Sequence, residues 1–152
     1  MISYANLFGQ LASGKQFKNA VLDGAAFSFT TVPITDLVTG QSVTSRIVAM
    51  VPAGYMFVVD AIHVLPDASG ADTTITTAAT CVIAMKDKDG HTLVTKTYAS
   101  TGSFVAGSLG TVSTTYQRLE EGDALYLNIT NAATVLLPDF FLQVSGTISK
   151  IK

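Results

Sequence analysis

The sequence predicts an all-β domain, an antiparallel sandwich or barrel of short strands. The first observation is that turn residues interrupt the chain roughly every 8–12 residues from residue 26 onward. The second is that the segments between these turns alternate apolar and polar residues, the pattern of a half-buried strand. The third is that polar positions carry Thr and Ser more than Lys and Glu, and the branched β-carbon of Thr favours extended backbone.

Size and composition bound the domain organisation. The chain has 152 residues, enough for one domain with a sizeable core, and no linker or internal repeat divides it. We assign residues 1–25 to an N-terminal arm and residues 26–152 to a β-sandwich domain. Only 13% of residues are charged and 48% are hydrophobic, so a monomer would expose much weakly polar surface. The composition therefore favours an oligomer over a low-charge monomer.

Charge and cysteine content argue against several classes of partner. A net charge of −2 with scattered Lys and Arg disfavours nucleic acid. Apolar runs fall well short of the roughly 20 residues that span a bilayer, so no membrane partner is expected. The first residues lack the cationic segment of a secretory signal. The single cysteine, Cys81, excludes an intramolecular disulfide and, within the run CVIAM, is expected to be a buried small hydrophobe.

The N-terminal arm carries an amphipathic stripe. Ser3 suits a helix N-cap and Gly14 a C-terminal stop. Such a short helix, with Gly9 inside it, needs a surface to pack on. We predict a short helical or extended arm that lies on its own domain or, the interpretation we favour, on a neighbouring molecule. Its anchors are the apolar residues at helical spacing, Tyr4, Leu7, Phe8 and Leu11.

Three strands are predicted next, over residues 26–32, 42–51 and 55–65. The first ends at Pro33 and the second at Pro52-Ala53-Gly54, because Pro removes a ladder donor and Gly permits the turn. The second strand is expected to place Val43, Ser45, Ile47, Ala49 and Val51 on one face.

The strand over residues 55–65 is apolar on both faces, which a strand at the surface of a monomer should not be. Such a strand needs a covering layer on each side, and we predict that the second cover is another copy of the protein. One face is expected to carry Tyr55, Phe57, Val59, Ala61, His63 and Leu65, and the other Met56, Val58, Ile62 and Val64 around Asp60. The predicted subunit interface is Tyr55, Phe57, Val59 and His63.

The rest of the chain continues the pattern of strand and turn. Residues 81–86 and 91–98 flank the turn Asp87-Lys88-Asp89-Gly90, a strong hairpin signal because Asp-Gly accepts positive φ. Strands follow over residues 124–130 and 140–148, with a turn over residues 119–123 between the loops and the first of them. Residues 67–80 and 99–113 are rich in Thr, Ser, Ala and Gly and are expected to be loops.

The sequence offers little chemistry for catalysis. His63, His91 and Cys81 are not spaced as metal ligands, so no metal or other cofactor is expected. Asp87 and Asp89 resemble a fragment of a calcium loop, but the closing Glu is missing and a turn is the better interpretation. Sugar platforms commonly use exposed aromatic rings, and the chain contains no Trp. The remaining aromatic candidates for sugar contacts are Tyr55, Tyr98, Tyr116 and Tyr126.

Two segments resemble the turn-strand pairs of viral jelly-roll modules. They are Val51-Pro-Ala-Gly-Tyr55, before the long apolar strand, and Leu119-Glu-Glu-Gly-Asp-Ala-Leu-Tyr-Leu-Asn-Ile129. In pattern the likeness covers roughly residues 46–148 and is similar to the capsid decoration (cement, or head auxiliary) proteins of tailed bacteriophages. The Gly-Asp-x-Leu-x-Leu element also occurs in phage fibre tips, tumour-necrosis-factor-like trimers and cupins. Cupins are disfavoured because the metal-binding histidines expected around their motifs are missing here.

The resemblance implies a jelly-roll-type β-sandwich, commonly a trimer, that docks on the outside of an icosahedral shell. We therefore expect a structural virion protein, not an enzyme, that decorates and stabilises a bacteriophage capsid. Its expected partners are further copies of itself and the major capsid protein, on the capsid surface after synthesis in the host cytoplasm. The alternative is a receptor- or glycan-binding domain of a phage fibre or baseplate, with specificity in the loops over residues 67–80 and 99–113.

Overall fold

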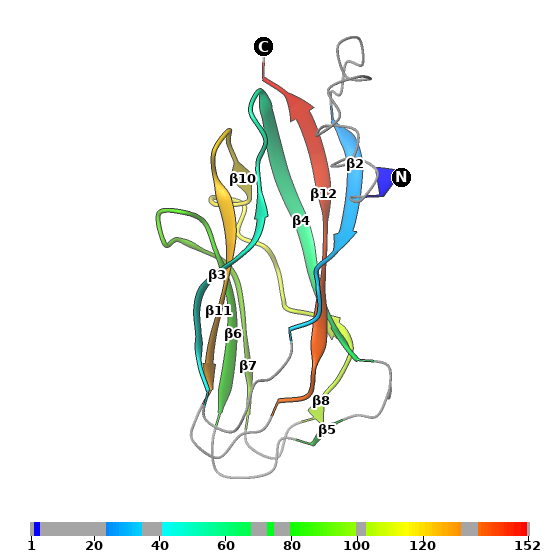
Figure 1. Ribbon diagram of the computed structural model, residues 1–152, viewed down its shortest axis with the longest axis vertical. Coiled ribbons are helices and arrows are strands. Elements are labelled where there is room, and N and C mark those ends of the chain that lie inside the picture. Colours follow the sequence, from blue (N-terminus) through cyan, green and yellow to red (C-terminus); the bar gives the residue numbers. More distant parts are fainter. Residues whose placement is uncertain are drawn as a thin grey trace.

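The computed structural model describes residues 2–3, 24–34, 41–67, 73–74, 80–99, 103–131 and 137–151. Within these ranges all regular structure is β. The strands form two large facing sheets, and β5 and β8 pair in a third sheet of two short strands (Figure 1). The predicted all-β, antiparallel sandwich is therefore confirmed. The strands are β1 (Ile2–Ser3), β2 (Ala25–Thr30), β3 (Val43–Met50), β4 (Tyr55–Pro66), β5 (Thr73–Thr74), β6 (Cys81–Lys86), β7 (Thr92–Tyr98), β8 (Ser103–Phe104), β9 (Gly107–Ser108), β10 (Arg118–Leu119), β11 (Ala124–Asn131) and β12 (Phe140–Lys150).

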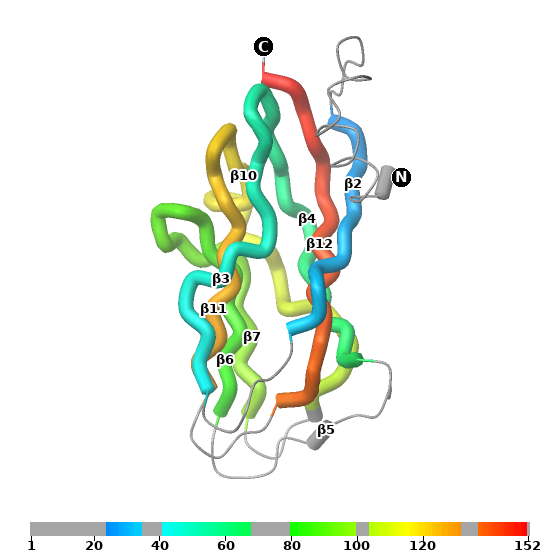
Figure 2. Tube along the Cα trace, in the orientation of Figure 1, coloured from blue at the N-terminus to red at the C-terminus, as the bar shows by residue number. Residues whose placement is uncertain are grey.

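The two sheets differ in strand order. The larger sheet runs β1-β2-β12-β4-β10, with β9 also paired to β4, and the smaller sheet runs β3-β11-β6-β7. The short β1 lies parallel to β2, and the other strand pairs are antiparallel. The chain passes between the two large sheets six times: from β2 to β3, β3 to β4, β4 to β6, β7 to β9, β10 to β11 and β11 to β12. Strands β2 and β12, from the two ends of the described chain, lie side by side (Figure 2).

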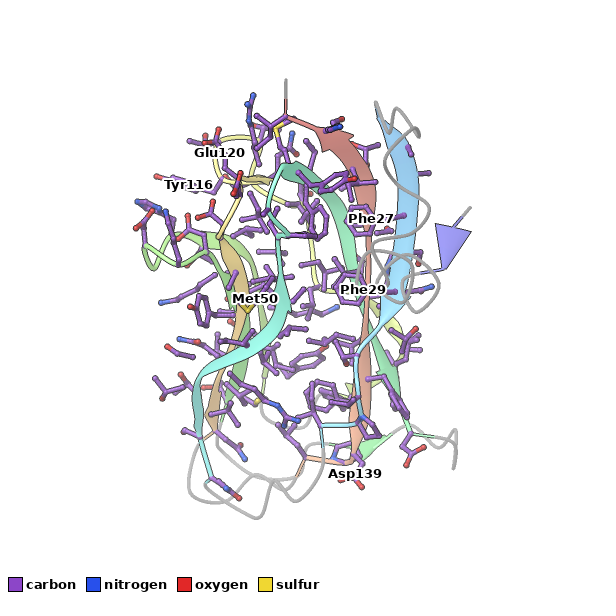
Figure 3. The ribbon with its side chains drawn as sticks, turned by 45° about the horizontal axis from the view of Figure 1, so that its top comes forward. Phe27, Phe29, Met50, Tyr116, Glu120 and Asp139 are labelled. Carbon is purple, nitrogen blue, oxygen red and sulfur yellow. The ribbon has the colours of Figure 1, made fainter. Side chains whose placement is uncertain are left out.

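The core fills the space between the sheets. Figure 3 shows Phe27 and Phe29 directed from β2 into this space. The Phe27 ring lies 5.0 Å from that of Phe57 on β4, between centroids. The predicted alternation is confirmed in two strands, where every second residue is buried. These residues are Leu125, Leu127 and Ile129 in β11 and Phe140, Leu142, Val144 and Ile148 in β12.

A β-bulge at Asp60 reverses the faces of β4. Val59 pairs with Gly146 and Ala61 pairs with Ser145, which leaves Asp60 as an extra residue without a partner on β12. The inward residues are therefore Tyr55, Phe57 and Val59 before the bulge and Ile62 and Val64 after it. The prediction that one face carries every odd-numbered residue from Tyr55 to Leu65 is wrong beyond Asp60. The outward face is still mostly apolar after this change, because it carries the half-buried residues Met56, Val58, Ala61, His63 and Leu65.

Strand β3 contains two further irregularities. Its register against β11 shifts near Val48 and again near Ser45, and Ser45 has a left-handed φ of 53°. Ala49 and Val51 are buried as predicted, whereas Ile47 is 53% exposed. The predicted common face of Val43, Ser45, Ile47, Ala49 and Val51 is therefore wrong, because each shift moves the residues before it to the other side.

The segment over residues 99–113 supplies core residues that the sequence pattern did not indicate. It contains the two-residue strands β8 and β9, and Phe104, Leu109 and Val112 are buried. The Phe104 ring packs edge-on against Phe140 at 5.4 Å between centroids. By contrast, the predicted hairpin of β6 and β7 is confirmed, with Gly90 at a φ of 86° in its turn.

Candidate functional site

The predicted subunit interface does not form a common surface. Tyr55, Phe57 and Val59 are 7%, 2% and 1% exposed within a single chain, so they have no area left for a second subunit. His63 lies beyond the bulge, half-buried on the opposite face of β4. We correct the assignment accordingly: the cover over the first three residues is the smaller sheet of the same chain. The arm anchors Tyr4, Leu7, Phe8 and Leu11 lie outside the described residues, as does most of the arm.

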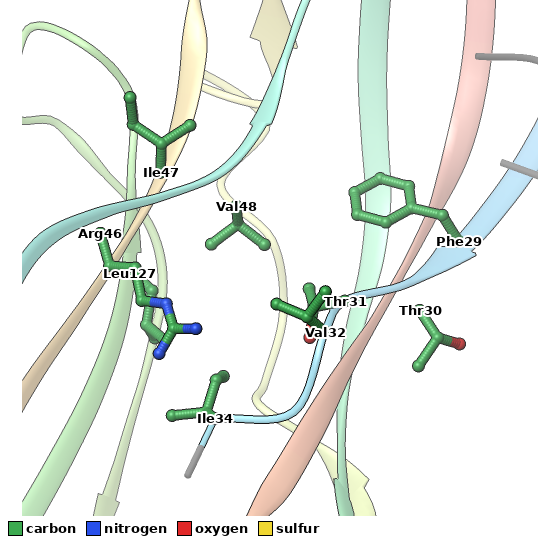
Figure 4. A pocket seen from close by; sticks show the side chains of 9 residues that line it. All are labelled: Phe29, Thr30, Thr31, Val32, Ile34, Arg46, Ile47, Val48 and Leu127. Carbon is green, nitrogen blue, oxygen red and sulfur yellow. The ribbon is translucent and has the colours of Figure 1, made fainter. Parts of the chain in front are cut away.

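An apolar groove opens where β2 and β3 diverge. Its volume is about 180 Å³, and its lining comes from the end of β2, the segment after it and β3 (Figure 4). Phe29 and Ile34 form its buried base, whereas Val32 is 70% and Ile47 is 53% exposed. Sequence analysis missed this rim. The position of Val32, immediately before Pro33 at a strand end, was an available signal, but the exposure of Ile47 follows from a bulge that the sequence does not reveal.

The two segments on which the viral resemblance rests form one corner of the sandwich. The Val51 N–H donates to the Asp123 carbonyl at 2.8 Å, and the Gly122 N–H donates to the Val51 carbonyl at 3.3 Å. The Gly54 N–H donates to Glu121 Oε2 at 3.0 Å. Segments about 70 residues apart in the sequence are thus held together by backbone and carboxylate hydrogen bonds.

The hairpin turn between β6 and β7 gathers Asp87, Asp89 and His91 within ligand distance of one another. Asp87 Oδ1 accepts the N–H groups of Asp89 and His91, and Asp87 Oδ2 lies 2.8 Å from His91 Nδ1. Lys88 Nζ bonds Asp89 Oδ2 and Asp123 Oδ1, each at 2.9 Å. These contacts hold the hairpin turn together, and a cation would have to compete with them for the Asp87 and Asp89 oxygens.

The same contacts change the pKa of the Asp87 carboxyl. Partial burial alone would raise its pKa, but hydrogen bonds from the His91 side chain and backbone, the His91 charge and the Asp89 N–H together lower the pKa below its usual value. The imidazole of His91 also stacks on Tyr116 at 4.5 Å between centroids. In the described part of the chain, neither His91 nor His63 hydrogen-bonds a Ser or Cys side chain.

A polar pocket of about 240 Å³ lies on the outer face of the smaller sheet. Its lining comes from three adjacent strands and the hairpin turn: Ser45 of β3, Tyr126 and Asn128 of β11, Lys86 of β6, and Asp87, Lys88 and Gly90. Of the four tyrosines considered for sugar contacts, Tyr55 and Tyr98 are buried and Tyr116 is stacked on His91. Only Tyr126 is half-buried at the wall of a pocket.

Cys81 is fully buried, as the sequence predicts, and burial raises the pKa of its thiol to about 11. At pH 8 only about one molecule in a thousand then carries a thiolate, the form that reacts with disulfide reagents. We expect native protein to resist Ellman's reagent, whereas the same protein in denaturant reacts with one equivalent. Rapid labelling of the native protein would show that β6 opens readily.

Comparison with known protein families, curated proteins and solved structures finds no match to this chain. Within the described ranges, the structure contains no helix of the length and apolar character needed to cross a bilayer.

Proposed function

We propose that this protein is a structural assembly module that decorates and stabilises a bacteriophage capsid, acting as a trimer. The observation that carries the proposal is the apolar groove with its exposed rim. Val32 and Ile47 leave large apolar side chains in solvent on both sides of a lined cavity, and exposed apolar surface of this kind marks contact with another protein.

The strand order supports the jelly-roll part of the proposal. Eight strands, β2, β3, β4, β6, β7, β10, β11 and β12, pass between two layers in chain order. Four of them form the order β2-β12-β4-β10 within the six-stranded sheet, and the other four form the sheet β3-β11-β6-β7. A double sheet of eight strands with Greek-key connections is the jelly-roll pattern found in viral capsid domains. The low charge of the chain suits weak contacts that are repeated around a symmetric lattice, where multivalency supplies the affinity.

The experiment uses tagged full-length protein to recover material from a lysate of the cells in which it is naturally made. Electron microscopy of the recovered material should show icosahedral particles with the protein at regular surface positions, and sedimentation should show a trimer. Recovery of no particles, together with a monomer at high concentration, would overturn the proposal.

Two variants test whether the protein binds the particle through the apolar groove. Ile47→Asp places a charge on the rim and is expected to reduce particle binding about tenfold or more, because buried apolar contacts dominate such interfaces. Ile151→Asp is the matched control, since Ile151 is also exposed, at 43%, but lies at the end of β12 away from the groove. Equal loss of binding in both variants would argue against the groove as the contact surface.

A second function, recognition of a receptor or glycan by a phage fibre or baseplate domain, is favoured by one observation. The polar pocket presents side-chain hydrogen-bonding groups beside a tyrosine ring, the composition of a sugar site. Adsorption of the isolated protein to host cells, without any particle, would support this function over the capsid role.

A further inference from the structure

We propose that the polar pocket binds an acidic sugar, with its carboxylate held by Lys86 and Asn128 and its ring against Tyr126. This inference rests on the second proposed function, recognition of a glycan, and is independent of the capsid role. It assigns the ligand class and the residues that distinguish acidic from neutral sugars.

The pocket presents hydrogen-bond donors and one ammonium group, that of Lys86, without a bonded partner in the described ranges. Lys86 lies opposite Tyr126 in the ladder between β6 and β11, and its side chain makes no ion pair or hydrogen bond within the described ranges. Asn128 Oδ1 accepts the Ser45 N–H at 2.9 Å, which leaves the amide NH₂ group of Asn128 as a donor. An ammonium group and an amide donor at one wall favour an anionic ligand, because charge-assisted hydrogen bonds are the stronger class.

The other charges at the pocket are already paired. Lys88 is bonded to Asp89 and Asp123, and both oxygens of Asp87 accept hydrogen bonds from its own turn or contact His91. The hydrogen-bonding positions of the Asp87 carboxylate are therefore used within the hairpin, while its negative charge remains at the pocket lining. Lys86 is the lining cation whose ammonium group is left to bond a ligand.

The backbone conformation of Ser45 is a second, independent observation about this wall of the pocket. Its left-handed φ of 53° is unfavourable for a residue with a β-carbon, and the Asn128 side chain holds it in place. Such conformations occur at β-bulges and at binding sites, and Ser45 belongs both to the irregular part of β3 and to the pocket lining. Here the strain turns the backbone of β3 so that Ser45 lines the pocket and fixes the orientation of the Asn128 amide.

Size and shape favour a sugar over a simple anion. The volume of about 240 Å³ is more than one carboxylate fills. Tyr126 offers an amphipathic ring at the wall, suited to the apolar face of a sugar. A pyranose with a carboxylate, such as a uronic acid, satisfies both the charged and the aromatic walls.

The test is calorimetric titration of the full-length protein with glucuronate- and sialate-terminated oligosaccharides, their neutral counterparts, and a short Asp/Glu peptide, each up to about 10 mM. Binding of an acidic sugar, with much weaker binding of its neutral counterpart, is the expected result. Equal binding of the neutral sugars would overturn the inference of an acidic ligand but would still support the second proposed function, recognition of a glycan. Binding of the peptide alone overturns both and points to a protein partner, and binding of no probe also overturns the inference.

Two variants test whether the sugar binds at the polar pocket. Lys86→Met keeps the length of the side chain without its charge and is expected to weaken binding about tenfold or more. Asn128→Asp keeps the acceptor for the Ser45 N–H but replaces the donor with a carboxylate, so a comparable or larger loss is expected. Lys150→Met, on the larger sheet, is the control and should leave affinity unchanged. Unchanged affinity in Lys86→Met with retained circular dichroism would overturn the assignment.

Discussion

Replacing Gly146 with Ala is expected to destabilise the protein by at least about 3 kcal/mol, or to abolish soluble expression. A β-carbon on Gly146 would clash with the Val58 carbonyl oxygen and would lie 3.0 Å from the Val58 carbonyl carbon and 3.1 Å from Val59 Cα. These are backbone atoms of the adjacent strand, so no side chain can move aside to relieve the contact. The backbone approaches this closely because Gly146 faces the Asp60 bulge in the central β4–β12 pair.

Urea unfolding measures this effect. Ser145→Ala is the matched control, because Ser145 is the neighbouring residue on β12, pairs with Ala61 on the other side of the bulge, and is half-buried on the outer face. We expect its free energy of unfolding to change by less than about 0.5 kcal/mol. A loss below about 1 kcal/mol in Gly146→Ala would mean that the two backbones are farther apart than described.

Replacing Phe57 with Ala is expected to lower the free energy of unfolding by about 3–5 kcal/mol. Phe57 is 2% exposed and packs on Phe27 within the single-chain core, so the substitution leaves a cavity as well as removing buried apolar area. Because the ring is covered by the same chain, the loss should be independent of protein concentration. If Phe57 lay in a subunit interface, the difference between the variant and the parent protein would itself change with concentration, because the substitution would weaken association.

Phe141→Ala provides the control for this prediction. It makes the same chemical change on β12, but Phe141 is half-buried on the outer face of the larger sheet, opposite Leu65. Its expected cost is less than half that of Phe57→Ala, since little cavity is created. Unfolding at two protein concentrations distinguishes the outcomes. A larger cost for Phe141 than for Phe57 would mean that the outer face is the better covered of the two.

The regular strands could be read from the sequence. Alternation in β11 and β12, the Asp-Gly hairpin between β6 and β7, and the burial of Cys81 are set by neighbouring residues, and each was predicted correctly. These features depend on local rules, namely the period of two in a strand and the tolerance of Gly for positive φ. The all-β sandwich follows from the same rules.

The sequence identified single residues of the candidate sites but not which residues lie together. Tyr126 was among the tyrosines named as possible sugar contacts, but its partners Lys86 and Ser45 belong to two other strands, and only the order β3-β11-β6 brings them together. The predicted interface failed for a related reason. Tyr55, Phe57 and Val59 are apolar in any arrangement, and the sequence does not reveal whether a sister chain or the second sheet covers them.

What the sequence alone determined is thus the class of fold, the hairpin and the faces of the straight strands. The positions where the alternation reverses, at Asp60 in β4 and near Ser45 and Val48 in β3, depend on how the strands pair in the folded protein. A β-bulge depends on the pairing of two strands. The bulge in β4 is possible because Gly146 lies opposite it, and Gly146 is more than 80 positions away along the chain. Local sequence patterns do not reveal such a pairing. The fold class can therefore be predicted from local patterns, whereas the residues exposed on the surface depend on the register between strands that are distant in the sequence.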